Sequence, residues 1–576
     1  MVGHDYVLKL GNYELECQSA IEQLREQRII ERIWELDYTV WKSQSDEIVN
    51  RLGWLQAPSY TKSHIPSIES FIAELRNEGM THGLLLGMGG SSLAPEVFRS
   101  VFGVKPGYLD LAVLDSTVPD VVLTYARRLD PKRTLVIAST KSGGTVETIS
   151  FTKYFYAWLQ DALGDEKAGQ HFIAITDPGS GLETLAREWQ FRKIFLNDPN
   201  IGGRFSALSL FGMVPAALIG VDIEGFLKRA DRMAQRCQQH AESNPGAILG
   251  AVIGKLAQLG RDKLTFLLSP ELIPLGGWIE QLIAESTGKE GRGIVPIIGE
   301  AELDPTDYAP DRLFVLIQLA GENGHTHRVN ALVEAGHPVI EITLDRCEDL
   351  AGELFRWEMA TAIACYFLEV NPFDQPNVES SKVAARQMIA SYRQSGRLPE
   401  MEPTAIVDGI KIWSDASAKN ISDAIKRLMD HAQRGENGLN RSYVAIQSFM
   451  APSSEMDASL HKLRTAIQQS YRLATTVGYG PRFLHSTGQL HKGDAGNGLF
   501  IQITAPFAED TLIPEPSEPA SSHISFGTLA LAQALGDFHA LRAANRNIVR
   551  FHLSNDVIGG IKKIIESIRK LNKKAL

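Results

Sequence analysis

Short runs of apolar residues alternate with longer segments of mixed polarity from about residue 83 onward. The first four runs are HGLLLG at 82–87, LAVLD at 111–115, TLVIAS at 134–139 and HFIAITD at 171–177. Runs of this length and density are typical of strands buried on both faces of a parallel sheet. The segments between them are long enough to form crossover helices. The pattern therefore predicts a doubly wound α/β unit.

The same alternation returns further along the chain. KLTFLLS at 263–269, RLFVLIQLAG at 312–321 and HPVIEITLD at 337–345 are again separated by segments of helical character. Strands that alternate with helices in this way indicate a second doubly wound parallel sheet.

The two ends of the chain differ from this middle part. Residues 1–50 are polar with a helical pattern, and beyond residue 400 we expect strands at 443–450, 498–506 and 548–554 and a basic closing helix. No short internal repeat is visible. We predict an N-terminal helical segment at 1–55, α/β units at 56–240 and 241–400, and an α/β C-terminal extension at 401–576.

Composition narrows the functional class. A chain of 576 residues with 44% hydrophobic and 22% charged residues is typical of a soluble protein with several domains. Its net charge of −10 makes nucleic acid and anionic membranes unfavourable partners. The four cysteines are scattered without a CxxC pair, and Asp5 and Glu14 interrupt any secretory signal. We expect a cytoplasmic chain without a metal site.

A glycine-rich loop, LGMGGSSLAPEVF, follows the first predicted strand at residues 86–98. Gly90 and Ser91 stand where the backbone can approach an anion closely, next to the unpaired N–H groups at the start of a helix. A tight turn between strand and helix requires the same small residues, so this loop alone leaves both interpretations open.

A second loop of this kind, STKSGGTVET, follows the third predicted strand at residues 139–148. Its hydroxyls on Thr140, Ser142 and Thr145 can donate to a phosphate, and Lys141 is a candidate charge partner. Two such loops at the carboxyl ends of neighbouring strands predict one phosphate site at the crevice of the sheet. Neither loop has the spacing of a dinucleotide or Walker motif, and helix capping alone is the structural alternative.

Several segments of the chain resemble those of a known family. The paired loops resemble sugar isomerase (SIS) domains, and three later segments resemble those of the glucose-6-phosphate isomerase family. These segments are NIGGRFSALSLFG at 200–212, WIEQLIAESTGKEGRG at 278–293 and NPFDQPNVESSK at 371–382. With GYGPRFLHSTGQLHKG at 478–493, the chain is most similar to the isomerase half of fused transaldolase and phosphoglucose isomerase proteins.

The resemblance implies two SIS domains and a reversible aldose–ketose isomerisation of glucose 6-phosphate and fructose 6-phosphate through a cis-enediol. It implies a sugar-phosphate substrate and no cofactor, and a homodimer is compatible with it. Two alternatives stay open: an isomerase that also accepts mannose 6-phosphate, and a catalytically silent sugar-phosphate-binding protein. Transaldolase activity is not expected, because the motifs match the isomerase half only.

Moving a proton between carbons 1 and 2 requires a base and a cation that stabilises the enediolate. Glu285 shares a helix face with Trp278, Gln281 and Leu282 and is expected to lean toward a partly apolar crevice; the resemblance makes it the base. Arg204 is the candidate cation, because its guanidinium stays charged and offers forked donors.

The resemblance assigns the remaining residues. Lys382 would assist opening of the sugar ring, and Gln375 would contact the substrate. Ring opening also needs an acid and a base near the ring oxygen, and the resemblance implies a histidine for this role. His327 lies in the usual chain order, nine residues before Gly336, whereas LHSTGQ around His485 is the richer local motif but comes after the lysine. His485 requires the C-terminal region, or a partner subunit, to fold over the sugar site, and both histidines remain candidates.

Overall fold

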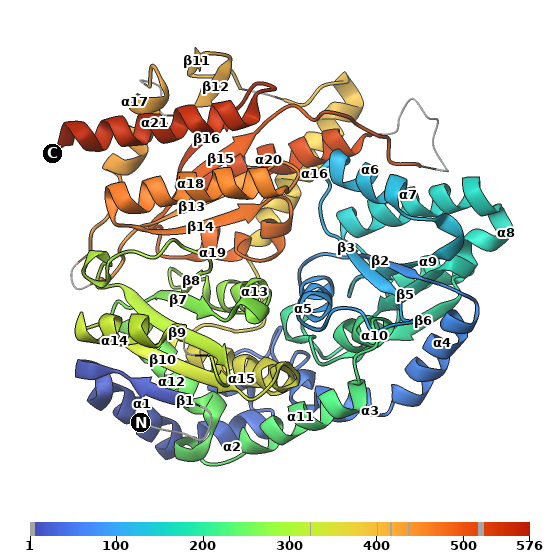
Figure 1. Ribbon diagram of the computed structural model, residues 1–576, viewed down its shortest axis with the longest axis horizontal. Coiled ribbons are helices and arrows are strands. Elements are labelled where there is room, and N and C mark those ends of the chain that lie inside the picture. The colour runs from blue at the N-terminus through green and yellow to red at the C-terminus, as the bar shows by residue number, and fades with distance from the viewer. Residues whose placement is uncertain are drawn as a thin grey trace.

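The computed structural model describes residues 6–322, 324–399, 401–414, 418–435, 438–515 and 524–575. Three mainly parallel sheets with flanking helices surround a central region where α5 (Leu93–Phe102), α13 (Leu275–Thr287) and α19 (Gly488–Gly493) lie (Figure 1). The α/β class with two doubly wound parallel sheets is therefore confirmed. Within the described residues, no helix is long and apolar enough to cross a membrane.

The first sheet contains five parallel strands in the order β3-β2-β4-β5-β6. The strands are β2 (His82–Leu86), β3 (Asp110–Leu114), β4 (Thr134–Ser139), β5 (Phe172–Thr176) and β6 (Lys193–Leu196). Leu85 packs into the core on one face of the sheet, and Leu84 and Leu86 pack into the core on the other. The order reverses between β2 and β4, so the two glycine-rich loops follow the two strands that flank the switch point.

Helices surround this first sheet. They are α3 (Ala57–Lys62), α4 (Ile65–Asn77), α5, α6 (Pro119–Arg128), α7 (Val146–Leu163), α8 (Asp165–Ala168), α9 (Gly181–Glu188), α10 (Leu210–Leu218) and α11 (Ile223–Arg236). The four predicted strands are present. The fifth, β6, was missed because its four residues are only partly buried and give a weak hydrophobic signal.

The second sheet has the order β1-β10-β9-β7-β8, in which β1 alone is antiparallel to its neighbour. Its strands are β1 (Tyr6–Lys9), β7 (Lys263–Leu268), β8 (Val295–Ile297), β9 (Arg312–Leu319) and β10 (Val339–Leu344). The associated helices are α1 (Glu14–Glu26), α2 (Ile29–Trp34), α12 (Pro245–Gln258), α13, α14 (Thr326–Glu334) and α15 (Leu350–Leu368), whereas α16 (Val378–Ser395) packs against α20 (Phe526–Ala543) of the C-terminal part. The N-terminal segment contains the helices α1 and α2, and in addition residues 6–9 form a strand that pairs with the edge of this sheet.

The third sheet lies in the C-terminal part and has the order β11-β12-β16-β15-β13-β14. Its strands are β11 (Ala405–Val407), β12 (Ile410–Trp413), β13 (Tyr443–Phe449), β14 (Ala474–Tyr479), β15 (Gly498–Thr504) and β16 (Asn547–His552). Its helices are α17 (Ile421–Asp430), α18 (Ser454–Tyr471), α19, α20 (Phe526–Ala543) and α21 (Val557–Ala575), and the 3-10 turn η12 (Arg482–His485) follows β14. Figure 1 shows β14 of this sheet beside β8 of the second sheet, with the first sheet on the other side of the central region.

Candidate active site

A cavity of about 1130 Å³ lies where the three sheets meet. The lining contains every candidate site residue except one: Gly90, Ser91, Thr140, Lys141, Ser142, Thr145, Arg204, Glu285, Gln375, Lys382 and His485. His327 is the exception, because it is exposed near the start of α14 and is not among the lining residues. The structure thus brings together residues that are almost 400 positions apart in the sequence.

The two glycine-rich loops form one wall of the cavity. The first residues of α7 line the cavity and α7 has no side-chain cap, so its first N–H groups remain available to a ligand, while α5 begins directly behind the first loop. The hydroxyl oxygens of Thr140 and Thr145 are 3.0 Å apart. Lys141 lines the cavity, but its ammonium pairs with Asp177 and donates to Pro199 O at 2.7 Å. Hydroxyls and the N-terminus of α7, rather than a free ammonium, are the donors at this wall.

The first loop requires glycine because it approaches other parts of the site closely. A Cβ on Gly90 would lie 2.0 Å from the carbonyl oxygen of Gly203, next to Arg204. Gly89 has φ +53°, and a Cβ there would lie 2.7 Å from Gln281 Nε2 and 2.9 Å from His485 O. The glycines thus allow the loop to contact the segments that carry Arg204 and His485.

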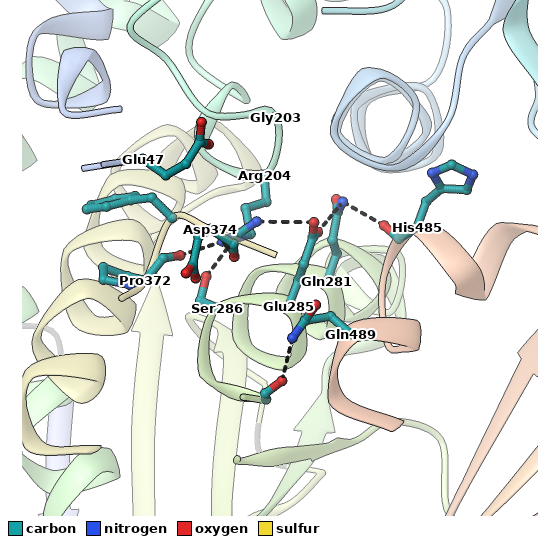
Figure 2. A network of polar contacts seen from close by, with 12 residues as sticks. Glu47, Gly203, Arg204, Gln281, Glu285, Ser286, Pro372, Asp374, His485 and Gln489 are labelled. Atoms are coloured by element: carbon teal, nitrogen blue, oxygen red, sulfur yellow. Dashed lines mark hydrogen bonds and ion pairs between the residues drawn. The ribbon is translucent and has the colours of Figure 1, made fainter. Parts of the chain in front are cut away.

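Glu285 and Arg204 form a buried ion pair at the floor of the cavity (Figure 2). Arg204 Nη1 is 3.1 Å from Glu285 Oε1, and Gln281 Nε2 donates to Glu285 Oε2 at 2.9 Å. The two charged residues are 5% and 6% exposed. Glu285 lines this partly apolar cavity, and its carboxylate lies directly against a guanidinium and a carboxamide.

Further hydrogen bonds fix the Arg204 guanidinium. Its Nε donates to Ser286 Oγ at 2.8 Å, and its Nη2 donates to the carbonyl oxygens of Pro372 at 2.6 Å and Asp374 at 3.0 Å. Because these partners lie on α13 and on the segment before α16, Arg204 holds both elements beside Glu285. Figure 2 shows this convergence of separate segments on one side chain.

Lys289 holds the segment that carries Gln375. Its ammonium donates to Asn371 O at 2.7 Å and Asp374 O at 2.6 Å and pairs with Asp374 Oδ1 at 2.7 Å. Burial, with a further contribution from Arg204, lowers the pKa of Lys289 to about 8. Lys382 lies on α16 with 46% of its side chain exposed, and its ammonium is 3.9 Å from Glu379.

His485 reaches the cavity from η12 of the C-terminal part. Its Nε2 lies 2.8 Å from Glu147 Oε1, and its carbonyl oxygen accepts from Gln281 Nε2 at 2.8 Å. Burial alone would raise the pKa of Glu147, but the charge and hydrogen bond of His485 outweigh it, and the pKa of Glu147 is lowered. Gln533 Nε2 also donates to Glu147 Oε1 at 2.6 Å. Glu147 therefore stays ionised and can orient the imidazole and stabilise its charged form.

Arg482 anchors the same 3-10 turn to the first sheet. Its guanidinium pairs with Glu96 and lies 3.2 Å from Asp115 Oδ2. Burial raises the pKa of Asp115 to about 6, although the charge of Arg482 opposes this shift. Burial likewise raises the pKa of Glu280 to about 7, again against the charge of Arg482. The turn carrying His485 is thus held by carboxyl groups from two other parts of the fold.

The sequence analysis did not identify several residues of this site. They are Glu147, Gln281 as a hydrogen-bond partner of Glu285, Lys289, Arg482, Gln489, which donates to Gly288 O at 2.9 Å, and Gln533. A glutamate in the first turn of a helix is usually explained by the helix dipole, so Glu147 gave no separate signal. Lys289, in contrast, lies four residues after Glu285 within the motif at 278–293, so the sequence did contain a signal for it.

The geometry suits proton transfer on a phosphorylated sugar. One wall offers donors for a phosphate, the floor holds a carboxylate beside a fixed guanidinium, and a histidine lines the same cavity next to Glu147 at the start of α7. Gln281 joins the last two elements, because its amide donates to both Glu285 and the His485 backbone. Among the described residues, no cluster of three His, Cys, Asp or Glu side chains could hold a metal ion.

Comparisons with known proteins agree with this arrangement. A family model described as phosphoglucose isomerase matches residues 72–293. The glucose-6-phosphate isomerase of a Thermus thermophilus strain is 30% identical over 393 residues, which cover 59% of this chain and 90% of that protein. The chain belongs to the phosphoglucose isomerase family. Another protein of this name, from Rubrobacter xylanophilus, is 28% identical and covers 57% of this chain and 87% of its own length.

Solved structures show that the phosphoglucose isomerase fold covers about two thirds of this chain. A hypothetical protein of Thermus thermophilus superposes with a TM-score of 0.58 and 25% identity, over 67% of this chain and 100% of its own. A glucose-6-phosphate isomerase of Chlamydia trachomatis superposes with a TM-score of 0.57 and 18% identity, over 67% of this chain and 88% of its own.

Proposed function

We propose that this protein interconverts glucose 6-phosphate and fructose 6-phosphate. The observation that carries the proposal is that one cavity is lined both by the two phosphate-type loops and by the buried Glu285–Arg204 pair. The relatives in the family are named glucose-6-phosphate isomerase, which supports the choice of a hexose 6-phosphate.

The reaction begins with binding and ring opening. Ser91, Thr140, Ser142 and Thr145 hold the phosphate together with the N–H groups at the start of α7. His485, oriented by Glu147, transfers a proton to the ring oxygen while the hydroxyl on carbon 1 loses its proton, which gives the open-chain aldehyde. Lys382 assists this step from the rim.

The isomerisation step uses the ion pair at the floor. Glu285 removes the proton from carbon 2 of the aldehyde, the proton of the carbon 2 hydroxyl passes to the oxygen on carbon 1, and Glu285 returns its proton to carbon 1 of the cis-enediolate. Arg204 stabilises the negative oxygen of the enediolate, since its guanidinium is already fixed and needs little reorganisation. Carbon 1 is reduced as carbon 2 is oxidised, so the electrons balance within the substrate.

Turnover of fructose 6-phosphate, measured by coupling product formation to glucose-6-phosphate dehydrogenase, tests the proposal directly. We expect formation of glucose 6-phosphate and, in the reverse direction, of fructose 6-phosphate. Tight binding of either sugar without turnover would contradict the proposal and identify a sugar-phosphate-binding protein. A comparable rate with mannose 6-phosphate would show that carbon 2 stereochemistry is not selected.

Thr145→Ala is expected to weaken binding of the phosphate. A hydrogen bond to a charged group contributes about 1.5–3 kcal/mol, so kcat/KM should fall about 10- to 100-fold, mainly through a higher KM. Thr326→Ala is the matched control, because Thr326 is exposed on α14 and does not line the cavity. An unchanged KM in Thr145→Ala would exclude this loop from phosphate binding.

A further inference from the structure

The third sheet repeats the topology of the second. The second sheet has the strand order β10-β9-β7-β8, and the third has β16-β15-β13-β14, with all four strands parallel in each case. The repeat extends to the edge, because an antiparallel strand pairs with the last strand of each series, β1 with β10 and β12 with β16.

The strand registers and connections also agree. Lys263 of β7 pairs with Val295 of β8 and Arg312 of β9, and Tyr443 of β13 pairs with Ala474 of β14 and Gly498 of β15. One helix joins the first two strands in each series, α13 in one and α18 in the other, and one helix follows the last strand, α15 or α21. We call residues 263–368 the second unit and residues 443–575 the third unit.

The two units meet through equivalent edges, β8 and β14. Glu300, just after β8, accepts from the backbone N–H of Thr475 at 2.9 Å, and a shared apolar cluster includes Val295 and Ile297 of one unit and Ala445 and Ala474 of the other. Contact between the same patch on two copies is the mark of a two-fold symmetric interface, here formed within a single chain.

The contacts across this interface are reciprocal. Helix α13 of the second unit meets the segment after β14, where Gln281 donates to His485 O at 2.8 Å. Helix α18 of the third unit meets the segment after β8, where Arg464 donates to Ile298 O at 2.6 Å and Gln468 donates to Ala301 O at 3.0 Å. In each unit, the helix that joins the first two strands contacts the segment after the second strand of the other unit. Two subunits of a symmetric dimer make contacts of this kind.

The two junctions differ in their chemistry. The junction of α13 with the segment after β14 faces the phosphate-type loops and contains Glu285 and His485. The junction of α18 with the segment after β8 is filled by buried charged side chains, since Glu300 pairs with Arg312 at 2.6 Å next to Arg464. The segment after β8, residues 298–311, contains no histidine, so the second unit has no counterpart of His485 at this position.

We propose that the third unit is a duplicate of the second that supplies the ring-opening histidine within the same chain, so that one polypeptide holds a complete catalytic site. The second unit keeps the base, Glu285, and the third unit keeps the acid–base histidine, His485. This inference rests on the proposed function for the roles of these two residues. It assigns the C-terminal part of the chain to the active site rather than to an accessory role.

Subunit mixing tests the proposal with full-length protein. Equal amounts of Glu285→Gln and His485→Ala chains, carrying different tags, are produced in the same cells and assayed with fructose 6-phosphate. If each site lies within one chain, the mixture shows only the residual activity of the two variants. If histidines cross between molecules, hybrid dimers restore one intact site and the mixture reaches about a quarter of wild-type activity, which would overturn the proposal.

A second mixture, of wild-type chains and chains with both substitutions, tests the same question independently. Wild-type chains mixed with an equal amount of chains carrying both substitutions should retain about half of the wild-type activity if sites are intrachain. Sites shared between molecules would give about a quarter, because every hybrid dimer then has two defective sites.

A covalent test does not depend on activity and separates this proposal from the proposed function. Arg127 of α6 and Glu509 of the third unit form an exposed ion pair, with side chains 63% and 51% exposed. In a Cys347→Ser background, chains carrying both Arg127→Cys and Glu509→Cys should be cross-linked by a short bismaleimide at the mass of one chain. A doubled mass, formed equally in a mixture of the two single-cysteine chains, would overturn the proposal even if the protein proved inactive on fructose 6-phosphate.

Discussion

Glu285→Gln is expected to lower kcat for fructose 6-phosphate by about 10²- to 10⁴-fold, the usual contribution of a general base. Glutamine keeps the size of the side chain, and its carbonyl oxygen can still accept from Arg204, but its amide nitrogen cannot accept from Gln281 and the side chain cannot take the proton from carbon 2. KM should change little, since the phosphate donors lie on other elements. The coupled assay with purified variant measures both parameters.

Glu271→Gln is the matched control for this variant, because Glu271 is exposed on a short 3-10 turn ahead of α13 and does not line the cavity. Its activity should equal that of the wild type. A Glu285→Gln protein with more than about a tenth of the wild-type kcat would exclude Glu285 as the base, given the size of general-base contributions.

His485→Ala is expected to lower turnover of cyclic fructose 6-phosphate by about 10²- to 10⁴-fold while leaving an open-chain substrate nearly unaffected. The reason is that the proposed mechanism places His485 at the ring oxygen and Glu285 at carbons 1 and 2. 5-Deoxyfructose 6-phosphate lacks the hydroxyl that closes the ring, so its rate reports the isomerisation step alone. The ratio of the two rates in each variant is the quantity to measure.

His327→Ala provides the control from the same chain. His327 is exposed on α14 and does not line the cavity, so its loss should change neither rate. A selective loss with cyclic substrate in His327→Ala, and not in His485→Ala, would reverse the assignment. An equal loss with both substrates in His485→Ala would show that this histidine acts on the isomerisation step or on binding.

The parts of the site that sequence could predict are those with local signals. The two glycine-rich loops each follow a strongly apolar strand, and their position at the sheet crevice follows from the order of parallel strands. Glu285, Arg204 and Lys382 lie within compact motifs. Their mutual placement was not predictable, because the Arg204–Glu285 ion pair joins residues 81 positions apart through packing of whole elements.

The placement of His485 illustrates the same limit. The LHSTGQ motif identified the residue, but whether the C-terminal region folds over the site depends on contacts such as those of Arg482 with Glu96 and Asp115, which join distant parts of the sequence. The sequence also did not reveal that the third unit repeats the topology of the second. Strand order and register persist when side chains change, because many apolar sequences satisfy the same buried strand.

Short elements were also missed by the sequence analysis. Strands β1, β8 and β11 contain three or four residues each, too few for a periodic pattern, and they form because a neighbouring strand offers them backbone partners. The N-terminal strand β1 therefore could not be distinguished from the helical segment that follows it.

In the proposed complex, a hexose 6-phosphate lies with its phosphate on the two loops and its reacting carbons between Glu285 and Arg204. A crystal structure with a five-carbon aldonate 5-phosphate tests this most directly, because its planar carboxylate imitates the enediolate. We expect the phosphate against Ser91, Thr140 and Thr145, and the carboxylate within hydrogen-bonding distance of Arg204. A phosphate bound instead by Arg386 or Arg393, elsewhere in the same cavity, with the carboxylate remote from Glu285, would contradict the account.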